Sequence, residues 1–343
     1  MTHYSFKNDY SEGAHPNILK ALTDSNLSQE DGYGLDSFSN QAREQITSRI
    51  KAPNSDVHFV SGGTQANLIV ISSVLKPHQA VIAATTAHIA VHEAGAIEAT
   101  GHKICTIQTD DGKLTIKHIQ SVLDEHTDEH MVQPKLVFVS NSTEVGSIYT
   151  KSELQEISKF CRNNDLILYL DGARLGSALA SEAADLTIED ITQLVDIYYI
   201  GGTKNGALLG EAIVINRDDL KEDFRFYLKQ KGALLAKGRL IGIQFLELFK
   251  DDLFFELAKH ANQMASKLAS AIQKAGYQFL ADPVSNQIFP ILPNQVIQKL
   301  SQKYGFYVWQ KIDDNQSAIR LVTSWATPEE VVDEFIQNLI NNS

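Results

Sequence analysis

The sequence predicts an α/β protein with a mainly parallel sheet covered on both faces, followed by a smaller α+β domain. Two observations predict the sheet. Between about residues 55 and 215 short apolar runs alternate with segments of helical periodicity, and the runs are apolar throughout rather than at every second position. A third observation predicts the second domain, because after residue 240 long helical segments and a few short strands replace this alternation. We therefore expect a large domain over residues 1–240, with an N-terminal arm, and a small domain over residues 241–343.

Each predicted strand of the large domain is a short apolar run. The runs are residues 57–60, 79–83, 103–107, 134–140, 166–170, 195–200 and 210–215. The segments with helical periodicity are residues 64–75, 91–100, 115–123 and 151–163. Open sheets of this kind bind ligands at the carboxyl ends of their strands, so functional side chains are expected there.

The C-terminal part has a different pattern. Helices are predicted over residues 240–249, 253–276 and 328–340, with short strands near 287–290 and 317–322. The chain contains no internal repeat, low-complexity stretch or long flexible linker. We therefore expect the two domains to pack closely.

Composition and charge exclude several classes of protein. The chain has 343 residues, 43% of them hydrophobic and 21% charged, which is ordinary for a globular enzyme. Its formal net charge of −12 argues against general binding of nucleic acid or anionic membranes, although it leaves room for one local phosphate pocket. The N-terminus lacks a signal-peptide pattern and no apolar run is long enough to span a bilayer, so we expect a cytoplasmic protein.

The two cysteines carry little functional signal. Cys105 and Cys161 lie in or beside apolar segments, which indicates buried thiols in a reducing compartment rather than a disulfide. They do not have the spacing of a metal site, and no metal is expected.

Lys204 and Asp171 are the most informative pair of residues. Asp171 ends one apolar run, and Lys204 follows another within a glycine-rich segment, residues 201–206. An acid and an amine at the ends of two strands suit pyridoxal 5′-phosphate (PLP), which needs a lysine for its Schiff base and a carboxylate for its pyridine nitrogen. A lysine that follows a strand is more often a solvated loop residue, so the pair alone does not establish this cofactor.

A glycine pair between a predicted strand and a helix is a candidate phosphate site. Gly62 and Gly63 permit close approach to the backbone, the free N–H groups of a helix start attract an anion, and Thr64 adds a hydroxyl. The alternative is an ordinary helix start with a permissive glycine pair. The segment is neither a P-loop nor a dinucleotide fingerprint.

Several short motifs, taken in order, resemble the threonine aldolase family, a beta-eliminating lyase branch of the fold type I PLP-dependent enzymes, whose fold is like that of aspartate aminotransferase. The motifs are Gly63-Thr64-Gln65-Ala66-Asn67, Ala87-His88 with Glu93-Ala94-Gly95, Asp171-Gly172-Ala173-Arg174, and Lys204. The resemblance extends from Asn8-Asp9 to Arg320-Leu321-Val322 and so covers nearly the whole chain.

The resemblance implies a role for each matching residue. Gly63 and Thr64, with Gly62, would bind the cofactor phosphate, His88 would stack on the pyridine ring, Asp171 would pair with the pyridine nitrogen and Lys204 would form the Schiff base. Arg174 would lie near the cofactor hydroxyl or the substrate carboxylate, and Arg320 would bind that carboxylate through a bidentate pair. Tyr33 would reach toward the site of a partner subunit, where Lys229 and Lys237 would approach the neighbouring cofactor's phosphate.

Each of these residues has a simpler explanation. His88 is equally a candidate for a core histidine, and His92, one turn later, competes with it. Arg174 caps local carbonyls in the alternative explanation, and Arg320 is a surface residue of a strand. Lys229, Lys231 and Lys237 form a solvated helix face, which is the usual meaning of such a run.

The sequence departs from the family pattern at two functional positions. Glu144 stands where the family has a histidine thought to handle the proton of the β-hydroxyl group, and a carboxylate of raised pKa is a suitable base. Asn8 replaces a serine that helps to hold the substrate carboxylate. These changes leave the cofactor assignment intact and put the substrate in doubt.

The resemblance therefore predicts a PLP-dependent lyase that cleaves L-threonine or L-allo-threonine to glycine and an aldehyde. Its catalytic residues would be Lys204, His88, Asp171 and Glu144, with Glu144 or His88 as the base, and its assembly a homodimer or homotetramer with shared sites. The rival hypotheses are β-elimination or transamination, a PLP-binding protein without turnover, and an α/β enzyme that uses no PLP.

Overall fold

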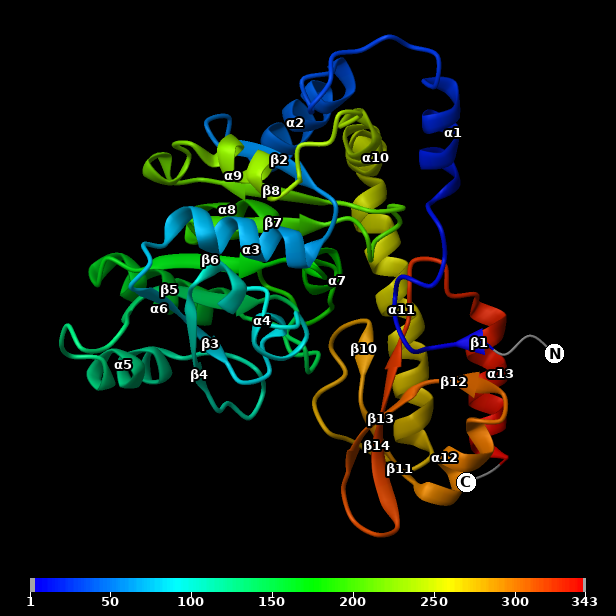
Figure 1. The fold of residues 1–343 in the computed structure, drawn as a ribbon. Helices are drawn as coiled ribbons and strands as arrows, with labels where there is room; N and C mark the ends of the chain where they lie inside the picture. The colour runs from blue at the N-terminus through cyan, green and yellow to red at the C-terminus, as the bar shows by residue number, and fades with distance from the viewer. Residues whose placement is uncertain (1–3, 342–343) are drawn as a thin grey trace.

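A computed structural model describes residues 4–341. Its centre is a seven-stranded sheet in the order β2-β8-β7-β6-β5-β3-β4 (Figure 1). The strands are β2 (Asp56–Val60), β3 (Gln79–Ala84), β4 (Lys103–Ile107), β5 (Gln133–Ser140), β6 (Ile167–Asp171), β7 (Ile197–Gly201) and β8 (Glu211–Ile215). Neighbours from β4 to β7 are parallel, whereas β8 is antiparallel to both β7 and β2. The predicted strands and the mainly parallel sheet are confirmed.

Helices cover both faces of this sheet (Figure 1). The α-helices between residues 4 and 249 are α1 (Pro16–Asp24), α2 (Ser37–Arg49), α3 (Gly63–Val74), α4 (His88–Val91), α5 (Ile116–Glu125), α6 (Lys151–Asn163), α7 (Leu175–Leu179), α8 (Ile188–Leu194), α9 (Phe224–Gln230) and α10 (Arg239–Phe249). Alternate residues of β3 enter opposite cores: Ala80 and Ile82 pack with α5 and α6, while Val81 and Ala83 pack with α3. Burial on both faces explains why the strands are apolar throughout.

The predicted helix over residues 91–100 is wrong. The helix α4 ends at Val91, and a short 3-10 helix occupies only Glu98–Thr100. Ala94 and Gly95 between them have φ values of 52° and 72°, a left-handed backbone that a right-handed helix cannot contain. The turn brings the side chain of Glu93 into the protein interior. The buried and exposed residues of this segment therefore do not follow the period of a helix.

The small domain packs helices against a five-stranded antiparallel sheet in the order β10-β14-β11-β9, with β13 also paired to β14. Its elements are α11 (Leu253–Lys274), β9 (Gln278–Phe279), β10 (Gln287–Ile288), β11 (Pro290–Pro293), α12 (Asn294–Leu300), β12 (Tyr304–Gly305), β13 (Tyr307–Lys311), β14 (Gln316–Val322) and α13 (Glu329–Ile340). The predicted long helix, final helix and final strand correspond to α11, α13 and β14.

The N-terminal segment and the small domain are in contact. Strand β1 (Tyr4–Ser5) pairs with β12 (Figure 1). Phe6 lies in the apolar core formed by α11, α12, α13 and β14. In contrast, Ile241, Phe245 and Leu248 of α10 belong to the apolar core that contains Ala80 and Ile82 of β3. The N-terminal strand β1 thus lies beside C-terminal residues. The domain boundary at residue 240 remains a prediction.

Two further findings concern the cysteines and the lengths of the helices. Cys105 and Cys161 are buried free thiols, as predicted. Among residues 4–341 no helix combines the length and apolarity needed to cross a bilayer.

Candidate active site

One cavity of about 290 Å³ collects most of the residues that the sequence analysis selected. It lies at one edge of the sheet, where β2, β5, β6 and β7 end and β8 begins. The predicted residues that line it are Gly62, Gly63, Thr64, His88, Glu144, Asp171, Arg174 and Lys204. The other lining residues are Tyr10, Ser61, Ser140, Ser142, Ala173, Tyr199, Thr203 and Glu211.

The start of α3 forms an open cradle on one side of the cavity. Gly62 is the N-cap residue, and a Cβ atom there would have no described atom within 4 Å. The first N–H groups of a helix have no partners within the helix, and its dipole favours negative charge. This geometry suits a phosphate group at Gly62, Gly63 and Thr64.

Asp171 is held rigidly at the end of β6. Its Oδ1 accepts hydrogen bonds from the Tyr199 hydroxyl at 2.5 Å and from the Ala173 N–H at 3.0 Å, and its Oδ2 accepts one from Asn67 Nδ2 at 3.3 Å. Gly172 follows because a Cβ atom at that position would lie 1.8 Å from the Tyr199 carbonyl oxygen. Burial and the nearby Asp171 carboxylate raise the pKa of Tyr199 well above its usual value, so this phenol remains a donor.

Lys204 lies in the turn that follows β7 and has no ion pair or hydrogen bond within residues 4–341. Burial and the Arg174 charge lower the pKa of its amine, although Asp9, Asp171 and Glu211 oppose that shift. A desolvated lysine of lowered pKa is a suitable nucleophile toward a carbonyl group.

Glu211 is a neighbour of Lys204 that the sequence analysis missed. It begins β8, is 4% exposed, lines the same cavity and accepts the Gly202 N–H at 2.9 Å. Burial raises its pKa to about 7, and Lys204 opposes that shift. The available signal was an acid at the start of a strand that is otherwise apolar.

His88 is oriented by a carboxylate that the motif contained without an assigned role. His88 Nδ1 lies 2.8 Å from Glu93 Oε1, and Asn67 Nδ2 donates to the same oxygen at 2.7 Å. The carboxylate is an acceptor, so the proton of the ring belongs on Nδ1 and Nε2 is left for a ligand. His92 is exposed and does not line the cavity.

Glu144 lies in the loop after β5 and faces the same cavity. Its Oε1 accepts hydrogen bonds from the His88 backbone N–H and from the Ser140 hydroxyl, both at 2.9 Å. Burial, followed by the charge of Asp171, raises the pKa of Glu144. The carboxyl group therefore combines a fixed position with increased basicity.

The two predicted arginines differ in their pairing. Arg174 forms a bidentate ion pair with the buried Asp9, at 2.7 Å from Nε and 3.0 Å from Nη2. Arg320 donates to Gln287 Oε1 at 2.5 Å, and within the described residues its buried Nε has no hydrogen-bond partner and the group has no carboxylate. Burial and Arg174 lower the pKa of Arg320 to about 10. Arg320 is thus a buried cation without a carboxylate partner among residues 4–341, and it does not line the Lys204 cavity.

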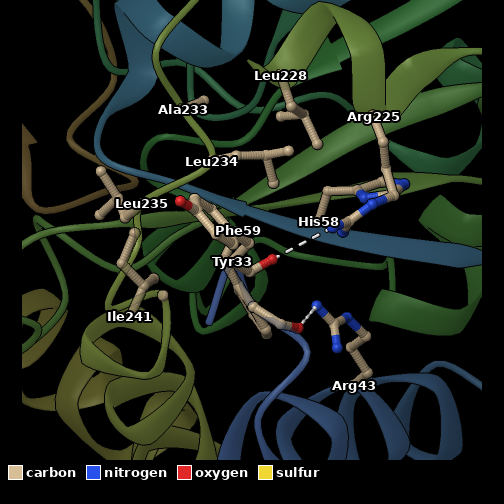
Figure 2. A pocket seen from close by; sticks show the side chains of 12 residues that line it. Tyr33, Arg43, His58, Phe59, Arg225, Leu228, Ala233, Leu234, Leu235 and Ile241 are labelled. Carbon is tan, nitrogen blue, oxygen red and sulfur yellow. Dashed lines mark hydrogen bonds between the residues drawn. The ribbon is translucent and has the colours of Figure 1, made fainter. Parts of the chain in front are cut away.

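Tyr33 lies away from the Lys204 cavity. Figure 2 shows it in a second cavity of only about 20 Å³, near Arg43 and Arg225. The Tyr33 carbonyl accepts a hydrogen bond from Arg225 Nη2 at 3.3 Å, and the Gly34 carbonyl accepts one from Arg43 Nη2 at 2.5 Å. Burial and these two arginines lower the pKa of His58 to about 3. The His58 imidazole that lines this cavity is therefore neutral near pH 7.

Four further predicted residues, Arg320, Lys229, Lys237 and Asn8, do not line the Lys204 cavity. Lys229 and Lys237 are exposed, and Lys229 Nζ lies 4.6 Å from the centre of the Tyr33 ring. The Asn8 side chain accepts hydrogen bonds from the Tyr10 N–H at 3.1 Å and the Ser11 hydroxyl at 2.9 Å, within its own turn. Among the described residues no group of three or more His, Cys, Asp or Glu side chains is arranged to hold a metal ion.

Comparisons with known proteins agree with this geometry. Residues 14–293 match the model of the beta-eliminating lyase family. The low-specificity L-threonine aldolase of Pseudomonas aeruginosa is 31% identical over 338 residues, covering 97% of this chain and 96% of that enzyme. A threonine aldolase structure from Leishmania major is 49% identical, with a TM-score of 0.97 and coverage of 98% of this chain and 99% of that one. An aspartate aminotransferase mutant from Thermus thermophilus, 12% identical, shares the fold with a TM-score of 0.71, covering 99% of this chain and 92% of its own.

Proposed function

The chain belongs to the threonine aldolase family of beta-eliminating lyases, and from this premise we propose that it cleaves L-threonine or L-allo-threonine to glycine and acetaldehyde. The reaction breaks the Cα–Cβ bond of a β-hydroxy-α-amino acid. The observation that carries the proposal is that Lys204, Asp171 and the Gly62-Gly63-Thr64 turn surround one cavity.

The residues around the cavity fit PLP. Gly62, Gly63 and Thr64 would hold its phosphate, Asp171 its pyridine nitrogen, Lys204 its carbonyl carbon and His88 the face of its ring. The open space at Gly62 supports this fit, as does the Lys204 amine, which has no ion pair or hydrogen bond within residues 4–341. When bound, the cofactor supplies an electron sink for the breaking Cα–Cβ bond.

The protein's own groups would orient the substrate and move its protons. Arg320, which has no carboxylate partner among residues 4–341, would bind the substrate carboxylate and so fix the bond that breaks. Glu144 would accept the proton of the β-hydroxyl group, because its raised pKa makes it a better base than an ordinary carboxylate. His88 is the alternative base, through Nε2, which has no hydrogen-bond partner in the part of the chain that the structure describes.

The experiment is to supply the PLP-loaded protein with L-threonine and L-allo-threonine and to measure glycine and acetaldehyde together. Equal amounts of both products, lost in Lys204→Ala, are expected. Comparison of Glu144→Gln with His88→Gln identifies the base, since loss of that group should slow the cleavage by about 10²-fold or more.

A second reaction class is favoured by one observation, the carboxylate Glu144 where the family has a histidine. The class comprises β-elimination and transamination. Release of ammonia with a keto acid, without glycine, would indicate elimination. A keto acid that forms only with a second substrate would indicate transamination, and either outcome would refute the aldolase proposal.

A homodimer, or a tetramer of two dimers, would complete the site. Tyr33, Lys229 and Lys237 lie outside the Lys204 cavity of their own chain, which supports contributions to a partner's cavity. Mixing Lys204→Ala subunits with Tyr33→Ala subunits tests this arrangement. Activity recovered only on mixing is expected for shared sites, and two inactive variants that stay inactive together argue against them.

A further inference from the structure

Asn67 occupies a central position behind the cavity. It lies on α3, and its side chain is wholly buried. Its Oδ1 accepts the Tyr169 hydroxyl at 2.8 Å, and its Nδ2 donates to Glu93 Oε1 at 2.7 Å and to Asp171 Oδ2 at 3.3 Å. Ionised carboxylates only accept hydrogen bonds, so the amide nitrogen must face both acids, with one hydrogen for each.

The two carboxylates need this donor. The Glu93 side chain is fully buried, and among the described residues its Oε2 has no hydrogen-bond partner, so Asn67 and His88 satisfy this acid through Oε1 alone. Asp171 receives its other hydrogen bonds from Tyr199 and Ala173 on Oδ1. A buried acid without donors is costly, so removal of Asn67 leaves both acids poorly satisfied.

We propose that Asn67 is a positioning residue that joins His88 and Asp171 into one hydrogen-bonded unit. Its single amide nitrogen binds Asp171 directly and His88 through Glu93. His88, expected at the face of the cofactor ring, and Asp171, expected at the ring nitrogen, are therefore held at fixed positions relative to each other. The inference rests on the proposed function, because it assigns His88 and Asp171 to the cofactor site.

The choice of an amide at this position follows from its surroundings. An aspartate would have the same shape but would place a third acid against Glu93 and Asp171 and would supply no hydrogen in its ionised form. An apolar side chain would fill the space and leave Asp171 Oδ2 without its bond from Asn67. An amide supplies two hydrogens without a charge.

The test measures the dissociation constant of PLP from the cofactor-free full-length protein by spectrophotometric titration. Asn67→Ala removes both hydrogen bonds to the carboxylates. Tyr169→Phe is the matched control, because it removes a hydroxyl from the same buried place and leaves both bonds from Nδ2 in place. We expect the dissociation constant to rise at least about tenfold in Asn67→Ala and to change less than about threefold in Tyr169→Phe.

A second measurement separates positioning from general packing. Combining Asn67→Ala with Glu93→Gln should raise the dissociation constant by much less than the product of the single effects, because both changes break the same unit. Asn67→Ser retains one hydrogen-bond donor, so its dissociation constant for PLP should lie between those of wild type and Asn67→Ala. Asn67→Ser takes the place of Asn67→Ala in these measurements if Asn67→Ala does not fold.

Three results would overturn the inference. The first is an unchanged PLP affinity in Asn67→Ala or Asn67→Ser. The second is an equal loss of affinity in Asn67→Ala and Tyr169→Phe that parallels their losses in Tm. The third is a double variant whose dissociation constant rises by the product of the two single effects. A wild-type protein that does not bind PLP would instead refute the proposed function. Normal wild-type binding with unaffected Asn67 variants would refute only the role of Asn67.

Discussion

Asp9→Ala is expected to lower the free energy of unfolding by about 3–5 kcal/mol, because it leaves a buried guanidinium without its partner. Asp9 is 1% exposed and holds Arg174 through two bonds of 2.7 and 3.0 Å. It also accepts a hydrogen bond from Asn286 at 2.9 Å, which ties the N-terminal segment to the small domain. The substitution therefore breaks a bidentate pair and a hydrogen bond to the same carboxylate.

Urea unfolding at neutral pH measures this loss, with Asp24→Ala as the control. Asp24 pairs with Lys20, and both side chains are largely exposed, so its removal should cost less than about 1 kcal/mol. A loss in Asp9→Ala no larger than in Asp24→Ala would refute the reasoning.

The effect of Asp9→Ala should also depend on pH. Burial alone would raise the pKa of Asp9, but the charges of Arg174 and Lys204, together with the hydrogen bonds from Arg174 and Asn286, lower the pKa below its usual value. A carboxyl group of lowered pKa contributes stability above its unfolded pKa and loses that stability as the pH falls through its folded pKa. The difference between wild type and Asp9→Ala should therefore shrink on acidification.

Three further changes have distinct expected outcomes. If Glu144 is the base, Glu144→Gln should remove the acidic limb of the pH profile of kcat/KM, because burial raises the pKa of this carboxyl group. A limb that persists belongs to another group. Glu211→Gln should lower the pH midpoint for acylation of Lys204 in the cofactor-free protein, because the Glu211 carboxylate favours the ammonium form of Lys204. Mass spectrometry measures the extent of acylation at each pH. An unchanged midpoint would contradict an interaction between the two side chains. Gly172→Ala should lower the free energy of unfolding in urea by about 3 kcal/mol, because its Cβ atom would lie 1.8 Å from a backbone oxygen. Gly62→Ala should change that free energy by about 0.5 kcal/mol or less, because its Cβ atom would enter open space. Equal losses in the two variants would refute the steric account.

The strands of the large sheet were predictable because burial on both faces leaves a continuous apolar run, as in β3 and β6. The segment over residues 91–100 was not, because its apolar and acidic side chains are arranged by a turn at Ala94 and Gly95. The helices α1 and α2 were also not assigned, and their burial depends on packing against α10 from a distant part of the chain.

The candidate site divides in the same way. Lys204 and Asp171 could be selected from the sequence because each carries its own chemistry at the end of an apolar run. Their partners could not, because Asp9 and Arg174 are 165 residues apart in the chain and meet only in the folded protein. Glu211 comes near Lys204 through the antiparallel pairing of β8 with β7.

The sequence by itself determined the α/β class, the order of the strands along the chain and the residue types able to hold PLP, since these follow from local apolar patterns and short motifs. Only the tertiary structure decided which groups are charged, paired or free. It pairs Arg174 with Asp9 and leaves Arg320 without a carboxylate among residues 4–341, and it turns Asn67 toward two acids. The physical reason is that burial and hydrogen bonding depend on contacts between residues far apart in the chain, and these contacts set the chemistry of each side chain.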